Sequence, residues 1–191
     1  MGKELLFKAL NHESLDVVPW VPFTGVHAGK LKGYTAEEVL TDGEKLYQSL
    51  IEVNKMYTPD GMPIVFDLQI EAEILGCELI WAKDNPPSVK THPLAGNDKK
   101  IPCKCEMPTP ESGRMPMILD VMGKVKKEIG DKTALYGLIC GPLTLASHLR
   151  GSDIFMDMVT DPDYVKQLVS FCAEVSMKMT DYYADAGMDV I

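Results

Sequence analysis

Carboxylates that could do chemistry follow an apolar run of strand length. Asp67 lies near the end of the run 62–68, and Glu71 follows four residues later. An acid in an apolar run is costly to bury unless it is paired, so we predict that Asp67 is a catalytic carboxylate. The alternative is that Asp67 caps a helix that begins near Ile70. Glu71 and Glu73 could line the same site as substrate-binding groups, or they could lie on a solvated helix face.

A strand-to-helix corner supplies a further candidate. The apolar run 134–140 predicts a strand, and the Gly-Pro pair at 141–142 turns the chain into a short helix that ends near residue 151. Corners of this kind carry ligand sites in α/β barrel proteins. His148 in this helix could bind a substrate; the alternative is a structural hydrogen bond.

The glycine-containing loop 24–33 holds two more candidates for substrate binding, His27 and Lys30. The alternative for His27 is an exposed loop position.

Cys103 and Cys105 form a close pair of thiols, but two thiolates without a nearby His or second Cys pair do not make a tetrahedral zinc site. We therefore expect this chain alone to bind no metal.

Alternating strands and helices must position these side chains. Thr35 and Glu38 have the spacing of a capping box, so a helix should begin there. The long segment 84–113 is rich in Pro, Gly, Lys and Asn and reads as an irregular insertion. Periodicity and breaker residues predict helices over 3–11, 35–57, 71–75, 114–129 and 161–186, and strands over 17–23, 62–68, 78–82, 88–92, 134–140 and 188–191.

This order predicts an α/β fold with a parallel sheet. Four main strands alternate with helices and the chain stops at the fourth, so they make half of an eight-stranded barrel or an unfinished doubly wound sheet. The first and fourth strands would then present free edges. We therefore expect self-association, or a companion chain that completes a barrel.

The composition excludes several classes of protein. The 191 residues are 46% hydrophobic and 25% charged, with a net charge of −9 and no basic cluster. Nucleic acid and anionic membranes are therefore not expected partners. The chain has neither an apolar run of the ~20 residues that span a bilayer nor a signal peptide. Five cysteines at irregular spacing do not suggest a disulfide framework, so we predict a reduced cytoplasmic protein.

Four segments carry a resemblance to a known family. They read KALNHESLDVVP at 8–19, FDLQIEAEILGCE at 66–78, GPLTLASHLRG at 141–151 and AGMDVI at 186–191. In this order they resemble the uroporphyrinogen decarboxylase superfamily, which also contains the cobalamin-dependent (corrinoid) methyltransferases. The resemblance implies a (β/α)8 TIM barrel, of which residues 1–191 form the N-terminal half, with the insertion at about 84–113.

The resemblance also bears on the candidate site. Asp67 stands nine residues before Gly76, as does the decarboxylase Asp that faces the substrate pyrroles. Val26 and Lys30 occupy places where the decarboxylases have arginines, and His148 stands where they have a tyrosine. A lysine offers a charge but not the bidentate fork of an arginine. The string at 69–78 is closer to the methyltransferase branch.

These residues favour a corrinoid-dependent methyltransferase that moves a methyl group from a methyl-corrinoid protein to a thiol. The resemblance implies zinc and a corrinoid for the complete enzyme, with the zinc ligands in the half that this chain lacks. We expect the chain alone to bind no cofactor and to be inactive. One alternative is a uroporphyrinogen decarboxylase of porphyrin biosynthesis, which acts on a tetrapyrrole and needs no cofactor. Another is a non-catalytic module that binds a corrinoid or a partner protein.

Overall fold

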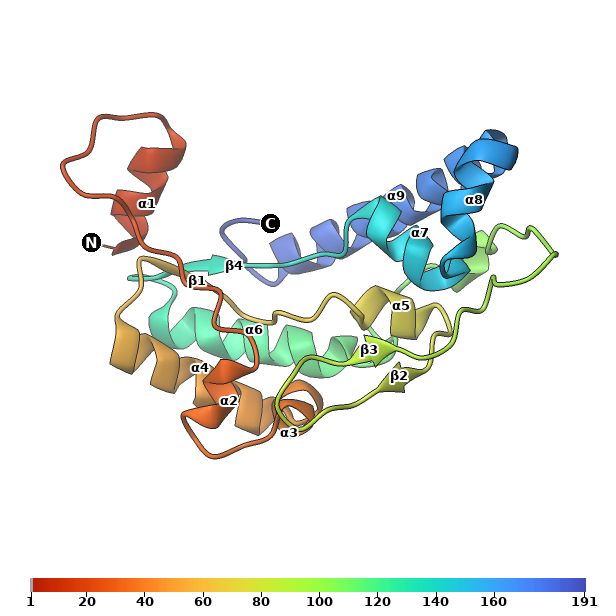
Figure 1. Cartoon of the computed structure of the whole chain (residues 1–191). Helices are drawn as coiled ribbons and strands as arrows, with labels where there is room; N and C mark the ends of the chain where they lie inside the picture. Colours follow the sequence, from red (N-terminus) through yellow and green to blue (C-terminus); the bar gives the residue numbers. More distant parts are fainter. Residues whose placement is uncertain (1) are drawn as a thin grey trace.

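Two parallel strands lie at the centre of the fold (Figure 1). The computed structural model describes residues 2–191. Strand β1 (Gly61–Pro63) pairs in parallel with β4 (Ala134–Tyr136), and an isolated parallel bridge joins Tyr136 to Val190. The predicted parallel arrangement is therefore confirmed for these segments. The regular strands are shorter than the runs 62–68 and 134–140, and the predicted strand 188–191 contributes only the bridge.

The segment 17–23 does not form the strand that we predicted. It is extended coil, and Val18 is 86% exposed. The backbone N–H of Trp20 donates to Asp60 Oδ2 at 2.7 Å, and the backbone N–H of Asp60 donates to the carbonyl of Trp20 at 3.0 Å. The prolines at 19 and 22 have no N–H to continue such a ladder on either side of Trp20.

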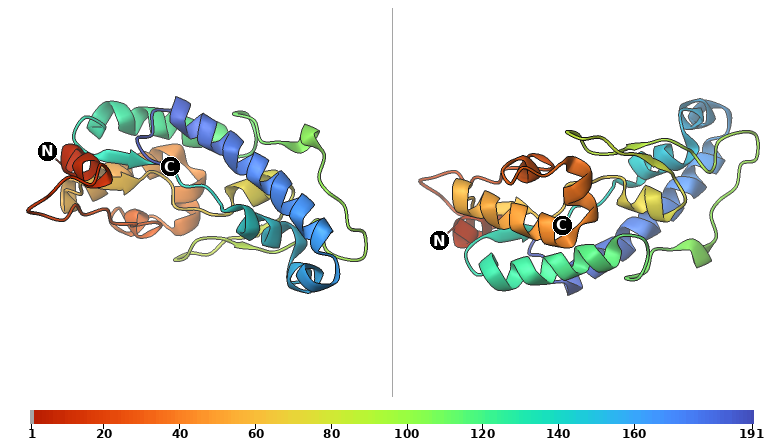
Figure 2. Two further views of the ribbon diagram at one scale, coloured as in Figure 1. Left: turned by 90° about the horizontal axis from the view of Figure 1, so that it is seen from above. Right: turned by 90° about the horizontal axis from the view of Figure 1, so that it is seen from below.

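Helices surround the two strands. Figure 2 shows α6 and α9 on one side of the strands and α2 and α3 on the other. Helix α4 packs along α6, and α7 packs along α9. No helix among residues 2–191 has the length and apolar character needed to cross a membrane. The helices are α1 (Gly2–Leu10), α2 (His27–Lys30), α3 (Ala36–Thr41), α4 (Gly43–Tyr57), α5 (Ile70–Ile74), α6 (Met115–Ile129), α7 (Pro142–Arg150), α8 (Asp153–Thr160) and α9 (Pro162–Asp185), with a 3-10 turn, η1 (Lys104–Glu106).

The predicted helix over 35–57 is two helices. The capping box is present: Thr35 Oγ1 accepts the N–H of Glu38 at 3.2 Å, and Glu38 Oε2 accepts the N–H of Thr35 at 2.8 Å. Helix α3 then ends, because Asp42 adopts an extended conformation and caps α4. Its carboxylate accepts the N–H groups of Glu44 and Lys45 at 3.0 and 3.1 Å.

The segment between α7 and α9 contains a helix that the sequence analysis did not assign. In α8, Ile154 is buried whereas Phe155, Met156 and Val159 are exposed. Its apolar residues therefore lie on several sides rather than in one stripe, and a search for a stripe does not find such a helix.

An antiparallel hairpin spans the start of the insertion, with its first strand just before residue 84. Strand β2 (Leu79–Ile80) pairs with β3 (Ser88–Val89), and the two form a sheet separate from β1 and β4. The two short strands predicted here are thus present but shorter. The rest of the insertion runs around the outside of the molecule to α6 (Figure 2).

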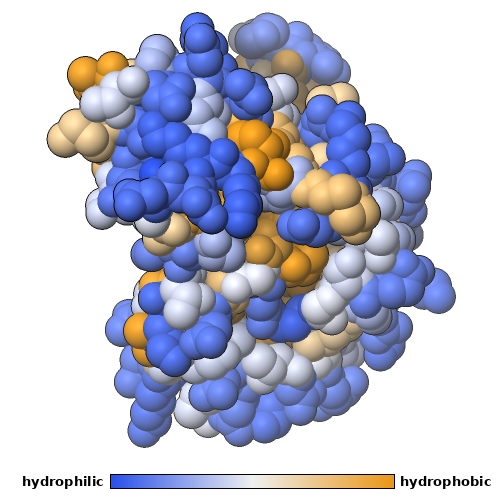
Figure 3. Space-filling view, turned by 90° about the vertical axis from the view of Figure 1, so that its right-hand side faces the viewer, coloured by the Kyte–Doolittle hydropathy of each residue, from blue (hydrophilic) through white to orange (hydrophobic). Residues whose placement is uncertain are grey.

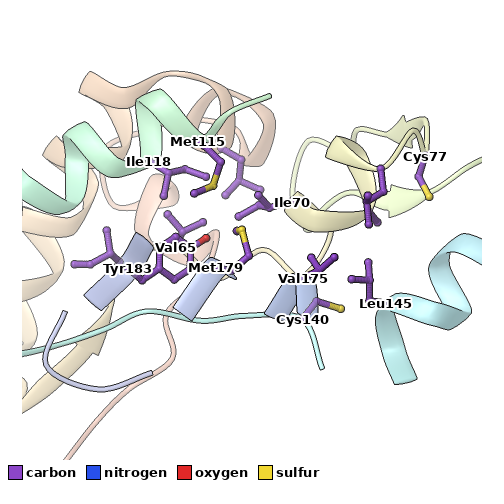
Figure 4. Close-up of a cluster of buried hydrophobic side chains, with 14 of the residues drawn as sticks. Val65, Ile70, Cys77, Met115, Ile118, Cys140, Leu145, Val175, Met179 and Tyr183 are labelled. Carbon is purple, nitrogen blue, oxygen red and sulfur yellow. The ribbon is translucent and has the colours of Figure 1, made fainter. Parts of the chain in front are cut away.

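A continuous buried core joins α6 and α9 to the end of β4. In Figure 4, Ile118 of α6 and Tyr183 of α9 lie at one end of this core. Cys77, which follows α5, and Leu145 of α7 lie at the other end. The chain ends are tied together beside it. Asp189 Oδ1 accepts the ammonium groups of Lys3 and Lys126, each at 2.7 Å, and Oδ2 accepts the N–H of Leu135 at 3.0 Å.

Candidate functional site

Four charged side chains meet where β1 leads into α5. We call Asp67, Glu71, Glu73 and Arg114 the Asp67–Arg114 cluster. Arg114 stands just before α6, where its Nη1 donates to Asp67 Oδ2 at 2.7 Å and its Nε donates to Glu73 Oε2 at 2.7 Å. Asp67 is 2% exposed. A carboxylate this deeply buried needs a partner, and Arg114 provides it.

Asp67 also contacts the backbone at the start of α5. Its Oδ1 accepts the N–H of Gln69 at 2.9 Å. This hydrogen bond lies just before α5, whose N-cap Gln69 makes no side-chain cap contact, so the alternative that Asp67 caps the helix is wrong. Oδ1 accepts the N–H of Gln69 and Oδ2 pairs with Arg114, so the Asp67 carboxylate is fixed in orientation.

Glu71 is not on a solvated helix face, and that alternative is wrong. The side chain is buried on the inner side of α5. Its Oε1 accepts the N–H of Cys140 at 2.8 Å. Burial raises the pKa of Glu71 to about 7, so this carboxyl can hold or release a proton near neutral pH. The hydrogen bond joins α5 to the segment that follows β4, next to the corner at Gly141.

Arg114 is a site residue that the sequence analysis missed. Its Nη1 also donates to the carbonyl of Leu40 at 3.1 Å, and the guanidinium lies 5.2 Å from the ring centroid of Trp81. Burial lowers the pKa of Arg114, but Asp67 and Glu73 outweigh burial and the net shift is upward. The sequence contained a signal that Arg114 is unusual, because only two of its 19 basic residues are arginines. Both arginines make ion pairs with acids.

Two polar groups of this region have no hydrogen-bond partner among residues 2–191. They are Arg114 Nη2 and the hydroxyl of Tyr183, both buried. Tyr183 comes from α9 and lies within the core shown in Figure 4. Burial raises its pKa, with smaller contributions from Glu71 and Asp67. Buried donors without partners are rare in folded proteins, so these two groups set this part of the core apart.

His27 and Lys30 do not join the cluster. His27 Nε2 lies 2.9 Å from the hydroxyl of Tyr57, and the two rings are stacked. Lys30 Nζ lies 3.4 Å from Asp84 Oδ1 in an exposed ion pair. The loop 24–33 contains the short helix α2, which packs on α4 and so turns these two side chains toward other partners.

His148 lies on α7, close to α5 but outside the cluster. Its carbonyl oxygen is 2.7 Å from His92 Nδ1 and accepts a hydrogen bond from Cys77 Sγ at 3.5 Å. The ring Nδ1 is buried and has no partner in the part of the chain that the structure describes. Burial lowers the pKa of His148, and His92 lowers it further. The ring is therefore neutral at pH 7 and can exchange a hydrogen bond with a ligand.

The face at the right of Figure 1 carries α5, α7 and α8. Figure 3 shows hydrophobic residues gathered at the middle of this face, with hydrophilic residues around them. Among residues 2–191, no three His, Cys, Asp or Glu side chains converge in a way that could hold a metal ion. The donor set of residues 2–191 therefore does not fit a zinc centre.

Comparison with known families assigns the chain. A family model described as uroporphyrinogen decarboxylase matches residues 1–191. The chain belongs to the uroporphyrinogen decarboxylase family. Its membership confirms the resemblance that the four sequence segments carry.

Curated relatives of this family member include two kinds of enzyme. The methylcobamide:CoM methyltransferase MtbA of Methanosarcina mazei is 28% identical over 99% of this chain and 56% of its own length. The methylcobamide:CoM methyltransferase MtaA of Methanosarcina barkeri is 25% identical over 99% of this chain and 57% of its own. A uroporphyrinogen decarboxylase of Wolbachia is 28% identical over 71% of this chain and 38% of its own.

A solved structure shares the fold. A methyltransferase from Methanosarcina mazei superposes with a TM-score of 0.86 at 23% identity, over 99% of this chain and 57% of that one. The α/β architecture is therefore that of the methyltransferase over this region. The chain spans a little more than half the length of the methyltransferases that it matches.

Proposed function

We propose that this chain supplies one wall of the active site of a corrinoid-dependent methyltransferase. The acceptor would be a thiol, and the methyl donor a methyl-corrinoid carried by a separate protein. One observation carries the proposal: Asp67, fixed by Arg114, and the buried Glu71, whose pKa is raised to about 7, lie near two buried donors that have no partner among residues 2–191. The methylcobamide:CoM methyltransferases among the relatives support this choice of reaction.

The residues of the cluster have distinct roles in this proposal. Asp67, held by Arg114, keeps a fixed negative charge in this wall. Glu71 holds a proton at neutral pH and can exchange it with an ionisable acceptor. Tyr183 and Arg114 Nη2 offer hydrogen bonds to the same ligand. The rest of a TIM barrel would close the site opposite this wall.

A bound zinc ion would lower the pKa of an acceptor thiol, which is the chemistry that the family resemblance implies. Since the donor set of residues 2–191 does not fit such a centre, no step of the proposal runs through a metal held by this chain. What this chain contributes is orientation, negative charge and a proton-holding carboxyl.

A uroporphyrinogen decarboxylase is the second candidate, because relatives of that kind also match and Asp67 keeps its spacing to Gly76. Two observations weigh against it. Val26 is buried, and Lys30 is paired with Asp84 rather than directed toward the cluster. A substrate with many carboxylates would therefore lack cationic partners at these places.

The test is binding of a corrinoid probe. Methylcobalamin is titrated into the chain and into Asp67→Asn, and uroporphyrin is titrated in parallel. This proposal departs from the expectation that the chain alone binds no cofactor: it predicts that methylcobalamin binds the wild-type chain and that Asp67→Asn weakens binding by about tenfold, roughly 1.4 kcal/mol. Asp120→Asn is the matched control, because Asp120 is an exposed acid on α6 that pairs only with Lys124.

Thermal melting of both variants separates binding from folding. Asn keeps the shape of Asp and can accept the same hydrogen bond from Gln69, so the turn that leads into α5 is retained. Equal methylcobalamin affinity in the wild-type chain and Asp67→Asn would contradict the role of Asp67. Binding of uroporphyrin alone would replace the methyltransferase proposal with the decarboxylase one.

A further inference from the structure

Two exposed thiols lie two residues apart on the outside of the molecule. Cys103 and Cys105 are exposed, whereas the other three cysteines are buried. Burial raises the pKa of each buried thiol and makes it a poor nucleophile. Any thiol chemistry of the folded chain with dissolved reagents therefore falls on this pair. The buried cysteines are Cys77, Cys140 and Cys172.

The backbone brings the two side chains together. Cys103 caps the 3-10 turn η1, and its Sγ accepts the N–H of Cys105 at 3.2 Å. The N–H of Glu106 donates to the carbonyl of Cys103 at 2.9 Å and closes the turn. Lys104, between the two cysteines, pairs with Glu174 of α9 at 3.0 Å. The Cys103 sulfur is thus folded back onto Cys105 by a turn that is anchored to the protein body.

The turn makes the two thiols unequal. Hydrogen bonds from the side chain and backbone of Cys105 lower the pKa of Cys103. The same side-chain contact raises the pKa of Cys105, and Glu106 acts against ionisation of both. Cys103 is therefore the thiol that ionises first, and Cys105 is the one that stays protonated beside it. A nucleophile next to a second thiol is the arrangement that thiol–disulfide exchange requires.

We propose that Cys103 and Cys105 form a redox-active dithiol that reacts with low-molecular-weight disulfides and closes to an intramolecular disulfide. The Cys103 thiolate attacks one sulfur of the small disulfide, forms a mixed disulfide and releases the first small thiolate. Cys105 then loses its proton and attacks Cys103 Sγ, which breaks the mixed bond and releases the second small thiolate. Two protein thiols are oxidised, one small disulfide is reduced to two thiols, and the two protons pass to the released thiolates.

This chemistry is independent of the methyl-transfer proposal. The dithiol lies in the insertion between β3 and α6, and the Asp67–Arg114 cluster does not include it. Two thiolates without further ligands do not make a tetrahedral zinc site, so the pair suits exchange better than zinc binding.

The test uses oxidised glutathione as the probe. The reduced chain is incubated with it, quenched with acid and weighed as an intact protein, and the peptide holding both cysteines is mapped. We expect loss of two hydrogens from the chain and a Cys103–Cys105 disulfide. Cys105→Ser should instead accumulate one glutathione adduct at Cys103. Cys103→Ser should react more slowly than Cys105→Ser, because only the Cys103 sulfur accepts the N–H of Cys105, a contact that favours its thiolate.

The double variant C103S/C105S is the control, and it should not react while the chain stays folded. Reaction of the double variant at the wild-type rate would place the chemistry on the buried cysteines and overturn the proposal. A wild-type product with two glutathione adducts, or with only chain-to-chain disulfides, would show that the pair does not close. Equal rates for Cys103→Ser and Cys105→Ser would remove the assignment of Cys103 as nucleophile. No reaction of the wild-type chain would overturn the proposal altogether.

Discussion

Glu71 carries a proton in the folded chain over a pH range where it would be ionised in the unfolded chain. Burial raises its pKa from 4.5 to about 7. Between these values the folded state binds more protons than the unfolded state, so stability falls as the pH rises from about 4.5 to 7. One pKa unit corresponds to about 1.4 kcal/mol, which makes the loss a few kcal/mol at most.

We therefore expect Glu71→Gln to flatten this part of the stability profile. Glutamine keeps an oxygen for the N–H of Cys140 and has no proton to lose. The variant should unfold at a higher urea concentration than the wild type at pH 8, with little difference at pH 4.5. Glu128→Gln, an exposed position on α6, serves as the control and should leave the pH dependence as it is. A Glu71→Gln curve that runs parallel to the wild type from pH 4.5 to 8 would contradict the burial argument.

The residues of the cluster differ in how well the sequence reveals them. Asp67 is visible because an acid inside an apolar run requires a partner. That partner, Arg114, stands 47 residues later, beyond the irregular insertion, where no periodic pattern connects the two. The burial of Glu71 depends on packing against the segment after β4, which local spacing does not specify. His27 and Lys30 fit the chemistry by type, but the packing of α2 on α4 gives them other partners.

At the scale of elements, Asp42 decides where α3 ends and α4 begins. Its carboxylate accepts two backbone N–H groups of the first turn of α4. We expect Asp42→Ala to lower the free energy of unfolding by about 0.5–2 kcal/mol, and Asp42→Asn to change it little, because Asn and Asp cap almost equally well. Urea denaturation followed by circular dichroism measures both. The cap interpretation fails if the Ala and Asn variants lose equal stability.

Elements with local signals were predicted well, and those that depend on distant contacts were not. A few adjacent residues determine the capping box at Thr35 and the start of α9 at Asp161-Pro162, and both features are present. The strand predicted at 17–23 needed a hydrogen-bonding neighbour that its prolines could not use. Helix α8 was not predicted, because much of its apolar surface faces outward and forms no single stripe.

At the scale of the whole molecule, apolar and hydrogen-bonding surface is open to a partner. Among residues 2–191, β1 pairs with β4 alone, and Phe155 and Val159 of α8 are exposed. Open strand edges and apolar patches favour association. We expect the purified chain to sediment with a concentration-dependent coefficient and to bind a hydrophobic dye.

Variants can test whether the exposed face of α8 takes part in this association. Phe155→Glu combined with Val159→Lys should weaken association if α8 takes part, whereas Met177→Glu, at an exposed position of α9, provides a control for added surface charge. A single sedimentation coefficient at every concentration, without dye binding, would contradict the prediction of self-association.

The ion pair between Lys3 and Asp189 has a consequence for how the protein matures on the ribosome. The two residues are 186 positions apart, and Lys3 also donates to the carbonyl of Gly130. At 5–20 residues per second, roughly ten to forty seconds separate the synthesis of Lys3 from that of Asp189. During this interval α1 can dock only partially, so its apolar side remains accessible to chaperones. The synthesis of the segment around Asp189 therefore completes the anchoring of the first helix.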